Sequence, residues 1–176
     1  FSDLVTMSFH PVKNITTGEG GALFLNNKKM YEKAKLLRSH NIVRNKLLNK
    51  KFGLWHYDIN SLGYNYRLTE LQSALGLSQL SKLDMFIKRR TEIANIYNSS
   101  FESCENITIP NVNHKVKHAY HLYPLRINFK KFKKNKKKFF LHMINKNIKL
   151  QVHYIPIHYH KFYQKKFGYK KNTLPI

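Results

Sequence analysis

The sequence predicts an α/β fold followed by a smaller α+β part, and three observations lead to this prediction. Two short apolar stretches, residues 4–9 and 22–25, flank a loop rich in Thr and Gly, which is the pattern of strand, tight loop and strand. Residues 28–38 and 70–101 carry apolar side chains at helical spacing. After residue 104, shorter strand-like and helix-like stretches alternate.

The residue pattern changes near residue 104, from long helical stretches to short strand-like and helix-like ones. This change predicts two domains, over residues 1–104 and 105–176. In the second, "HAYHLYPLRINF" and "IKLQVHY" are strand-like, and "KNKKKFFLHMINKN" is helix-like. Residues 39–62 have weak periodicity and predict a long, mobile loop. The chain begins at Phe1 rather than Met and stops after "NTLPI", so we expect both ends to be cut and the second domain to be incomplete.

The long helical stretch contains two signals for a helix N-terminus. Thr69 followed by Gln72 fits a capping box and predicts a helix start near Glu70. Ser81 followed by Asp84 is a second such signal and predicts a break between two helices. We expect this helix pair to connect the two domains.

The chain is strongly basic, with 32 Lys and Arg against 9 Asp and Glu among 176 residues, a net charge of +23. This balance makes a basic nucleic-acid or polyanion-binding protein the alternative function, and "FKKFKKNKKKFF" is its best segment. A solvated amphipathic helix with a lysine-rich outer face explains that segment equally simply. The joint abundance of Lys, Asn, Ile, Phe and Tyr is typical of an A/T-rich genome. We therefore favour a solvated, lysine-rich surface over nucleic-acid binding as the explanation of the positive charge.

No run of about 20 apolar residues predicts a transmembrane helix. There is also no signal-peptide pattern. The single cysteine, Cys104, has no partner for an internal disulfide, which favours a cytoplasmic protein.

Lys13 differs from the other lysines because it lies in the loop between the two predicted strands rather than in a charged cluster. A lysine acts as a Schiff-base nucleophile only when its amine is partly neutral, which burial or a nearby cation provides. Ser8, at a strand end, offers a hydroxyl for a phosphate, and Gly18, Gly20 and Gly21 let the backbone approach a ligand. On spacing alone, however, a Gly-rich hairpin with an exposed lysine is the preferred interpretation.

Longer stretches carry a family resemblance. "SFHPVKNITTGEGGALFLNN", "LRSHNI" and "LGYNYRLTELQSALGLSQLSKLDMFIKRR" closely resemble the sugar aminotransferases of the DegT/DnrJ/EryC1/StrS family, and "VHYIPIHYHKFYQ" resembles their small domain. Within the family, the sequence is most similar to the transaminases that aminate C4 of a UDP-linked 4-keto-6-deoxy-N-acetylhexosamine on the route to pseudaminic acid. Which nucleotide-sugar is used, and whether C3 or C4 is aminated, stays open.

The resemblance implies fold type I of the pyridoxal-phosphate (PLP) enzymes, with the C-terminal part of the large domain and an incomplete small domain. Lys13 then takes the place of the lysine that holds the cofactor and moves the proton. Ser8 matches the serine that binds the cofactor phosphate. Asn65 and Arg67 match a segment that reaches the neighbouring subunit's site, so the resemblance implies a homodimer with shared active sites.

His153 and Tyr154 match a segment that approaches the nucleotide-sugar, and Trp55 is a further candidate for lining the site. Ordinary roles remain open: strand residues for the first two, packing for Trp55, a turn for Asn65 and a surface charge for Arg67. The histidines of "HYIPIHYH" lack Cys or carboxylate partners nearby, so we expect no metal site.

The resemblance also implies what is missing. The family's carboxylate against the cofactor's pyridine nitrogen lies upstream of the lysine, so we expect poor carbanion chemistry from this chain alone.

L-Glutamate is the amino donor that the resemblance implies. Some relatives carry histidine in place of the lysine and dehydrate sugars; Lys13 favours amination.

Overall fold

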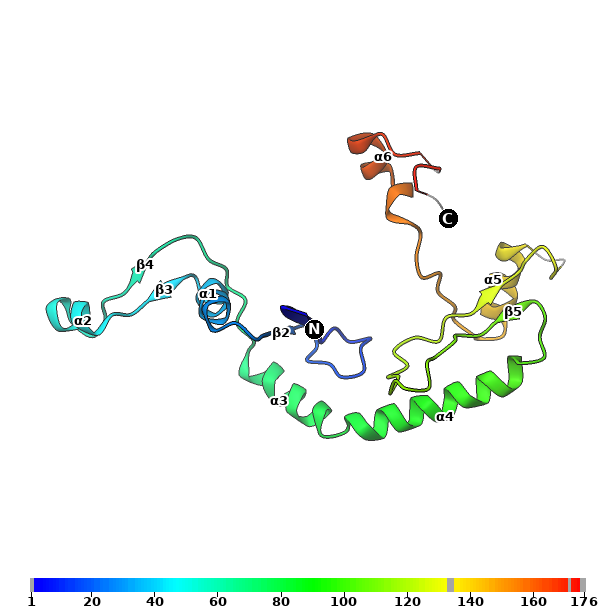
Figure 1. The fold of residues 1–176 in the computed structure, drawn as a ribbon, viewed down its shortest axis with the longest axis horizontal. Helices are drawn as coiled ribbons and strands as arrows, with labels where there is room; N and C mark the ends of the chain where they lie inside the picture. The colour runs from blue at the N-terminus through cyan, green and yellow to red at the C-terminus, as the bar shows by residue number, and fades with distance from the viewer. Residues whose placement is uncertain (1, 133–134, 171, 175–176) are drawn as a thin grey trace. The chain divides into compact units, whose positions relative to one another are not determined.

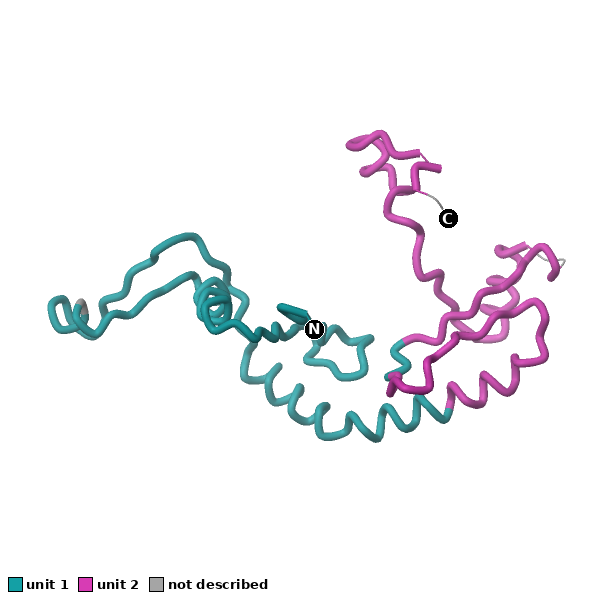
Figure 2. Tube along the Cα trace, in the orientation of Figure 1, with its two compact units in different colours: residues 1–92, 119–121 teal, residues 93–118, 122–176 magenta. Residues whose placement is uncertain are grey.

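The computed structural model describes residues 2–132, 135–170 and 172–174, which belong to two units (Figure 2). Unit 1 comprises residues 1–92 and 119–121, and unit 2 comprises residues 93–118 and 122–176. The division falls within one long helix, and the domain boundary after residue 104 stays a prediction.

Unit 1 begins with an antiparallel pair of strands, β1 (Leu4–Ser8) and β2 (Gly21–Leu25), whose register joins Leu4 to Leu25 and Ser8 to Gly21 (Figure 1). Residues 9–20 connect them and are called the lysine loop below. The predicted strand–loop–strand pattern is confirmed.

The helices predicted before residue 104 are also confirmed. Helix α1 (Lys28–Arg38) starts where the Asn27 side chain accepts a hydrogen bond from the Met30 N–H, at 3.0 Å. Helix α3 (Glu70–Leu80) starts at the Thr69 capping box. Helix α4 (Leu83–Phe101) follows after the predicted break.

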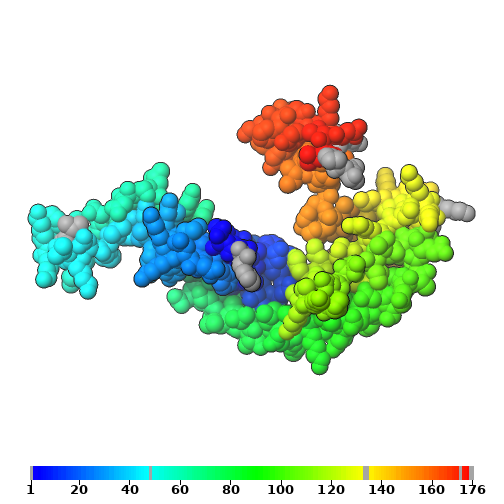
Figure 3. Space-filling view, in the orientation of Figure 1, coloured from blue at the N-terminus to red at the C-terminus, as the bar shows by residue number. Residues whose placement is uncertain are grey.

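The prediction of a long loop over residues 39–62 is wrong. This segment contains strand β3 (Ile42–Val43), helix α2 (Lys46–Phe52) and strand β4 (Asp58–Ile59), which pairs antiparallel with β3. The Asn45 side chain caps α2 by accepting from the Leu47 N–H at 2.8 Å. These elements are too short for periodicity to reveal them. Figure 3 shows the segment around α2, in cyan, as a lobe extending from the rest of unit 1.

Unit 2 combines short strands and helices, as an α+β unit should. Strands β5 (Ile107–Thr108) and β6 (Arg126–Ile127) pair antiparallel, and helix α5 (Lys136–Asn145) confirms the helix-like stretch. A 3-10 turn, η1 (Ile157–Tyr159), and helix α6 (Lys161–Phe167) follow.

The strand predictions for unit 2 hold only in part. In the first strand-like stretch, β6 alone is paired. "IKLQVHY" forms no strand, so that prediction is wrong. An alternating pattern gives a strand only when a neighbouring strand completes its hydrogen bonds, and the described residues provide none here.

Few side chains are buried. Among the described residues, only Ala94 (2% exposed), Thr17 (4%) and Asn41 (8%) are classed as buried. Helix α3 exposes a row of leucines, including Leu71, Leu75 and Leu77. The buried Thr17 lies in the lysine loop. In the described part of the chain, no helix has the length and apolar character needed to cross a membrane.

Candidate functional site

The lysine loop opens with a tight turn that fixes the backbone of Lys13. The Lys13 N–H donates to the His10 carbonyl at 2.9 Å and closes a turn over residues 10–13. Pro11 occupies the second position of this turn, where its fixed φ is favourable. The Lys13 side chain is half-buried, unlike the exposed lysines of α5.

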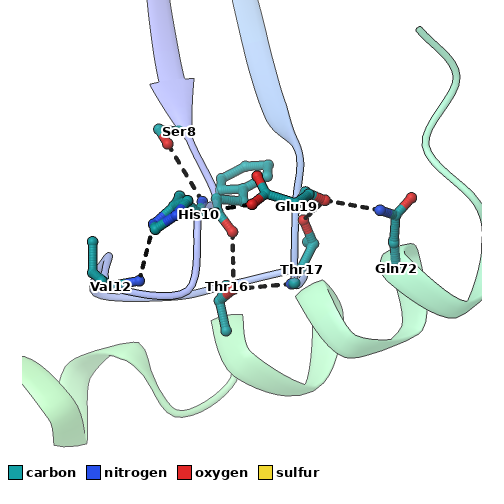
Figure 4. Close-up of polar contacts among 9 residues, drawn as sticks. Ser8, His10, Val12, Thr16, Thr17, Glu19 and Gln72 are labelled. Carbon is teal, nitrogen blue, oxygen red and sulfur yellow. Dashed lines mark hydrogen bonds and ion pairs between the residues drawn. The ribbon is translucent and has the colours of Figure 1, made fainter.

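Ser8 and Lys13 converge on the same residue. The Ser8 Oγ accepts a hydrogen bond from the His10 N–H at 3.3 Å (Figure 4). The His10 carbonyl accepts from the backbone N–H of Lys13. The Ser8 hydroxyl keeps its own proton to donate elsewhere. The structure therefore joins the predicted phosphate-binding serine and the predicted cofactor lysine through one residue.

The middle of the loop folds back onto its own beginning. The Phe9 carbonyl accepts from the Thr16 hydroxyl at 2.9 Å and from the Thr17 N–H at 3.1 Å. The Phe9 N–H donates to the Gly20 carbonyl at 2.9 Å, extending the β1–β2 pairing. These bonds satisfy several backbone groups of the loop from within the chain.

Helix α3 supports the end of the loop. The Glu19 carbonyl accepts from the Thr17 hydroxyl at 2.8 Å and from the Gln72 Nε2 at 2.9 Å (Figure 4). The Thr17 methyl group lies over Gly76, where an added Cβ would come within 2.9 Å of it. Sequence reasoning named Gln72 only as a capping residue, because periodicity does not reveal contacts between distant segments.

A second support comes from far along the chain. The Asn14 Nδ2 donates to the Ala119 carbonyl at 2.7 Å. Next to it, the Arg90 Nη1 on α4 donates to the Tyr120 carbonyl at 3.1 Å. Residues 119–121 therefore connect the residue after Lys13 with α4 inside unit 1.

Asn65 and Arg67 lie on an extended segment before α3, and both are exposed. Asn65 forms an isolated β-bridge with Ser39, and its neighbours Tyr64 and Tyr66 donate backbone hydrogen bonds to residues 37 and 38. The segment is held against the end of α1. The structure does not bring these two side chains to Lys13, and their role in a neighbouring subunit stays a prediction.

The remaining predicted site residues are well exposed. Trp55 is 77% exposed, and its ring lies against Gly53 at the end of α2, a packing contact. His153 and Tyr154 belong to unit 2, and their ring centroids are 3.6 Å apart. No group of three or more His, Cys, Asp or Glu side chains suited to a metal ion is found among the described residues.

Comparison with known proteins gives these features a context. The model of the DegT/DnrJ/EryC1/StrS aminotransferase family matches residues 1–176. The chain belongs to this family. Helicobacter pylori PseC, an aminotransferase involved in the biosynthesis of pseudoaminic acid, is similar in structure, with a TM-score of 0.86 and 37% identity. The match covers 100% of this chain and 44% of PseC. The predicted fold class, fold type I of the PLP enzymes, is thereby confirmed for the part that is present.

Curated relatives agree with this assignment. The chain is 42% identical over 167 residues to a UDP-4-amino-4,6-dideoxy-N-acetyl-beta-L-altrosamine transaminase of Campylobacter jejuni, covering 95% of the chain and 42% of the relative. It is 46% identical over 176 residues to an uncharacterised protein of Methanocaldococcus jannaschii, covering 98% of the chain and 45% of the relative. The chain thus spans less than half the length of these relatives.

Streptococcus pneumoniae Spr1654, solved in its PLP-form, matches with a TM-score of 0.79 at 27% identity over 93% of this chain and 41% of Spr1654. PLP is the cofactor of the family, as the resemblance implied.

Proposed function

We propose that this chain carries the lysine-bearing part of an aminotransferase that moves an amino group from L-glutamate to a nucleotide-linked keto-sugar. The observation that supports this most strongly is the lysine loop, in which the Ser8 hydroxyl and the backbone N–H of the half-buried Lys13 both form hydrogen bonds with His10. An amine and a hydroxyl on one short loop are the groups that an aldehyde cofactor with a phosphate requires. The names of the relatives favour UDP-4-keto-6-deoxy-N-acetylhexosamine as the acceptor.

Each residue has a defined task in this proposal. Bound PLP supplies an electron sink for the carbon that exchanges its amino group. The Lys13 Nζ holds the cofactor and carries the proton to and from that carbon. The Ser8 Oγ–H donates to the phosphate, which leaves the Oγ free to keep accepting from His10.

The remaining residues act at the edges of the site. Asn65 and Arg67, exposed on their extended segment, reach the site of a second copy of the protein in a homodimer. His153, Tyr154 and Trp55 contact the nucleotide-sugar. Their exposure in the isolated chain leaves their polar and aromatic groups available for such contacts. The basic chain also favours binding of anionic diphosphate substrates.

The test is Lys13→Ala in the complete gene product, measured as glutamate-dependent formation of 2-oxoglutarate with the UDP-keto-sugar as acceptor. We expect activity to fall by more than about 100-fold, since a positioned acid–base group contributes at least that much. Lys29→Ala, an exposed lysine of α1, is the matched control and should retain activity. Full activity of Lys13→Ala would contradict the proposal.

A further inference from the structure

The Gln72 side chain makes hydrogen bonds at two places, the start of α3 and the lysine loop. Its Oε1 accepts from the Thr69 N–H at 3.0 Å, and the Thr69 hydroxyl accepts from the Gln72 N–H at 3.2 Å. This is the capping box that starts α3. Its Nε2 donates to the Glu19 carbonyl in the lysine loop at 2.9 Å. One side chain therefore holds both the helix start and the loop.

The capping box alone would not need the second bond. A glutamate at this position caps a helix as well as a glutamine does, because only an acceptor oxygen is used. A glutamate has no N–H to offer the Glu19 carbonyl. The amide of Gln72 thus adds a donor whose only described partner is the lysine loop.

Packing supports the same junction. Gly20 has a φ of +151°, and a Cβ there would come within 2.9 Å of the Leu68 side chain and within 2.5 Å of the Thr17 hydroxyl. Leu68 directly follows Arg67, so the segment that carries Asn65 and Arg67 contacts the loop that carries Lys13. The loop, this segment and the first turn of α3 meet at Glu19, Gly20, Leu68 and Gln72.

We propose that Gln72 is a positioning residue that couples the lysine loop to the segment carrying Asn65 and Arg67. This inference rests on the proposed function for the roles of those residues, but the coupling itself concerns only contacts within the chain. Since Asn65 and Arg67 serve the neighbouring subunit in that proposal, a change in one lysine loop alters the second site of the dimer.

The decisive variant is Gln72→Glu, which keeps the capping acceptor and removes the donor to Glu19. Thr17→Val is the second variant, because it removes the other donor to the same carbonyl and keeps the methyl group against Gly76. Gln79→Glu makes the same chemical change elsewhere on α3 and serves as the control.

The first readout is amide hydrogen exchange in the 176-residue chain, followed at Phe9 and Thr17 in the loop and at Tyr66 in the segment. We expect exchange at all three amides to speed up about fivefold in Gln72→Glu, as loss of one net hydrogen bond implies. Thr17→Val should act in the same direction at Phe9, and Gln79→Glu should leave all three unchanged. Faster exchange of the loop amides with Tyr66 unchanged would overturn the coupling, and unchanged loop amides would overturn the positioning role.

The second readout connects the coupling to the site. The chain is incubated with PLP, reduced with borohydride and digested, and the share of label on Lys13 is compared with that on the other lysines. Gln72→Glu should lower this share severalfold while circular dichroism keeps the helix content of the parent chain. If the parent chain shows no preference for Lys13, the proposed function fails. The exchange experiment still decides the coupling, so the two failures are distinguishable.

Discussion

The lysine loop and the segment of residues 148–156 both carry predicted site residues, yet the chain holds them very differently. The loop is closed by hydrogen bonds from Phe9, Thr16 and Thr17 and is supported by α3. In residues 148–156, the Ile148 N–H donates to Met143 at 2.9 Å, and the described residues show no backbone donation from residues 149–155. His153 and Tyr154 are exposed there. The loop with the predicted cofactor residues is thus held by hydrogen bonds within the chain, whereas the segment with the predicted substrate residues has few such bonds among the described residues.

The sharpest test of this contrast, with the largest expected effect, is amide exchange in the unmodified chain. The Thr17 N–H is buried and bonded to Phe9, so it should exchange much more slowly than the N–H groups of His153 and Tyr154. The latter should exchange close to the rate of an unstructured peptide. Equal rates in the two segments would remove the distinction.

A substitution at Gly20 should break the ordered region. Its φ of +151° is reserved for glycine, and a Cβ would collide with Thr17 and Leu68. Gly20→Ala should therefore cost about 3 kcal/mol of unfolding free energy in the complete gene product, measured by denaturant unfolding.

Gly18→Ala is the matched control for this substitution. Gly18 has a φ of +79° with no atom near an added Cβ, so the change should cost only about 1 kcal/mol. Equal losses for the two variants would show that the contact of Gly20 with Thr17 and Leu68 contributes nothing.

The ordered parts were also the predictable parts, for a physical reason. Asn27 and Thr69 cap their helices with local side-chain bonds, and such bonds are visible in a few consecutive residues. The break near Ser81 was predicted in the same way. In contrast, α2 and the β3–β4 pair are short, and "IKLQVHY" has strand composition without a strand partner among the described residues.

In the candidate site, too, local features could be predicted from the sequence and contacts between distant segments could not. The loop pattern singles out Lys13 and Ser8, and the family resemblance implies their roles; in the structure, the Ser8 Oγ and the Lys13 N–H both bond to His10. The contacts of Gln72 with Glu19 and of Asn14 with Ala119 span long stretches of sequence, so no local pattern could have shown them. The roles of all the predicted site residues stay predictions: Lys13, Ser8, Asn65, Arg67, His153, Tyr154 and Trp55.

Helix caps offer a test of intermediate size. Thr69→Ala removes the cap of α3, and Asn135→Ala removes the cap of α5, where the Asn135 side chain accepts from the Lys138 N–H at 2.8 Å. Each should cost about 1 kcal/mol of stability. Hydrogen exchange should show that Thr69→Ala also loosens the lysine loop through Gln72, while Asn135→Ala affects only α5. Loosening of the loop by both variants would argue against a specific connection through α3.

The smallest effect is expected from the Glu19 carboxylate. Its Oε1 lies 3.8 Å from the His10 Nε2, and both side chains are largely exposed. An exposed ion pair contributes less than about 1 kcal/mol. Since the backbone carbonyl of Glu19 makes the loop contacts, Glu19→Gln should leave thermal unfolding and loop exchange nearly unchanged. A loss as large as that of Gly20→Ala would mean that the side chain, not the backbone, holds the loop.

The most direct measurement of the central claim is the site of covalent labelling when the chain is incubated with PLP, reduced with borohydride and mapped by peptide digestion. If the lysine loop is arranged in advance as a cofactor site, the label should concentrate on Lys13, even though the chain carries many exposed lysines. Label scattered over the exposed lysines, with no preference for Lys13 in this chain or in the complete gene product, would contradict the account.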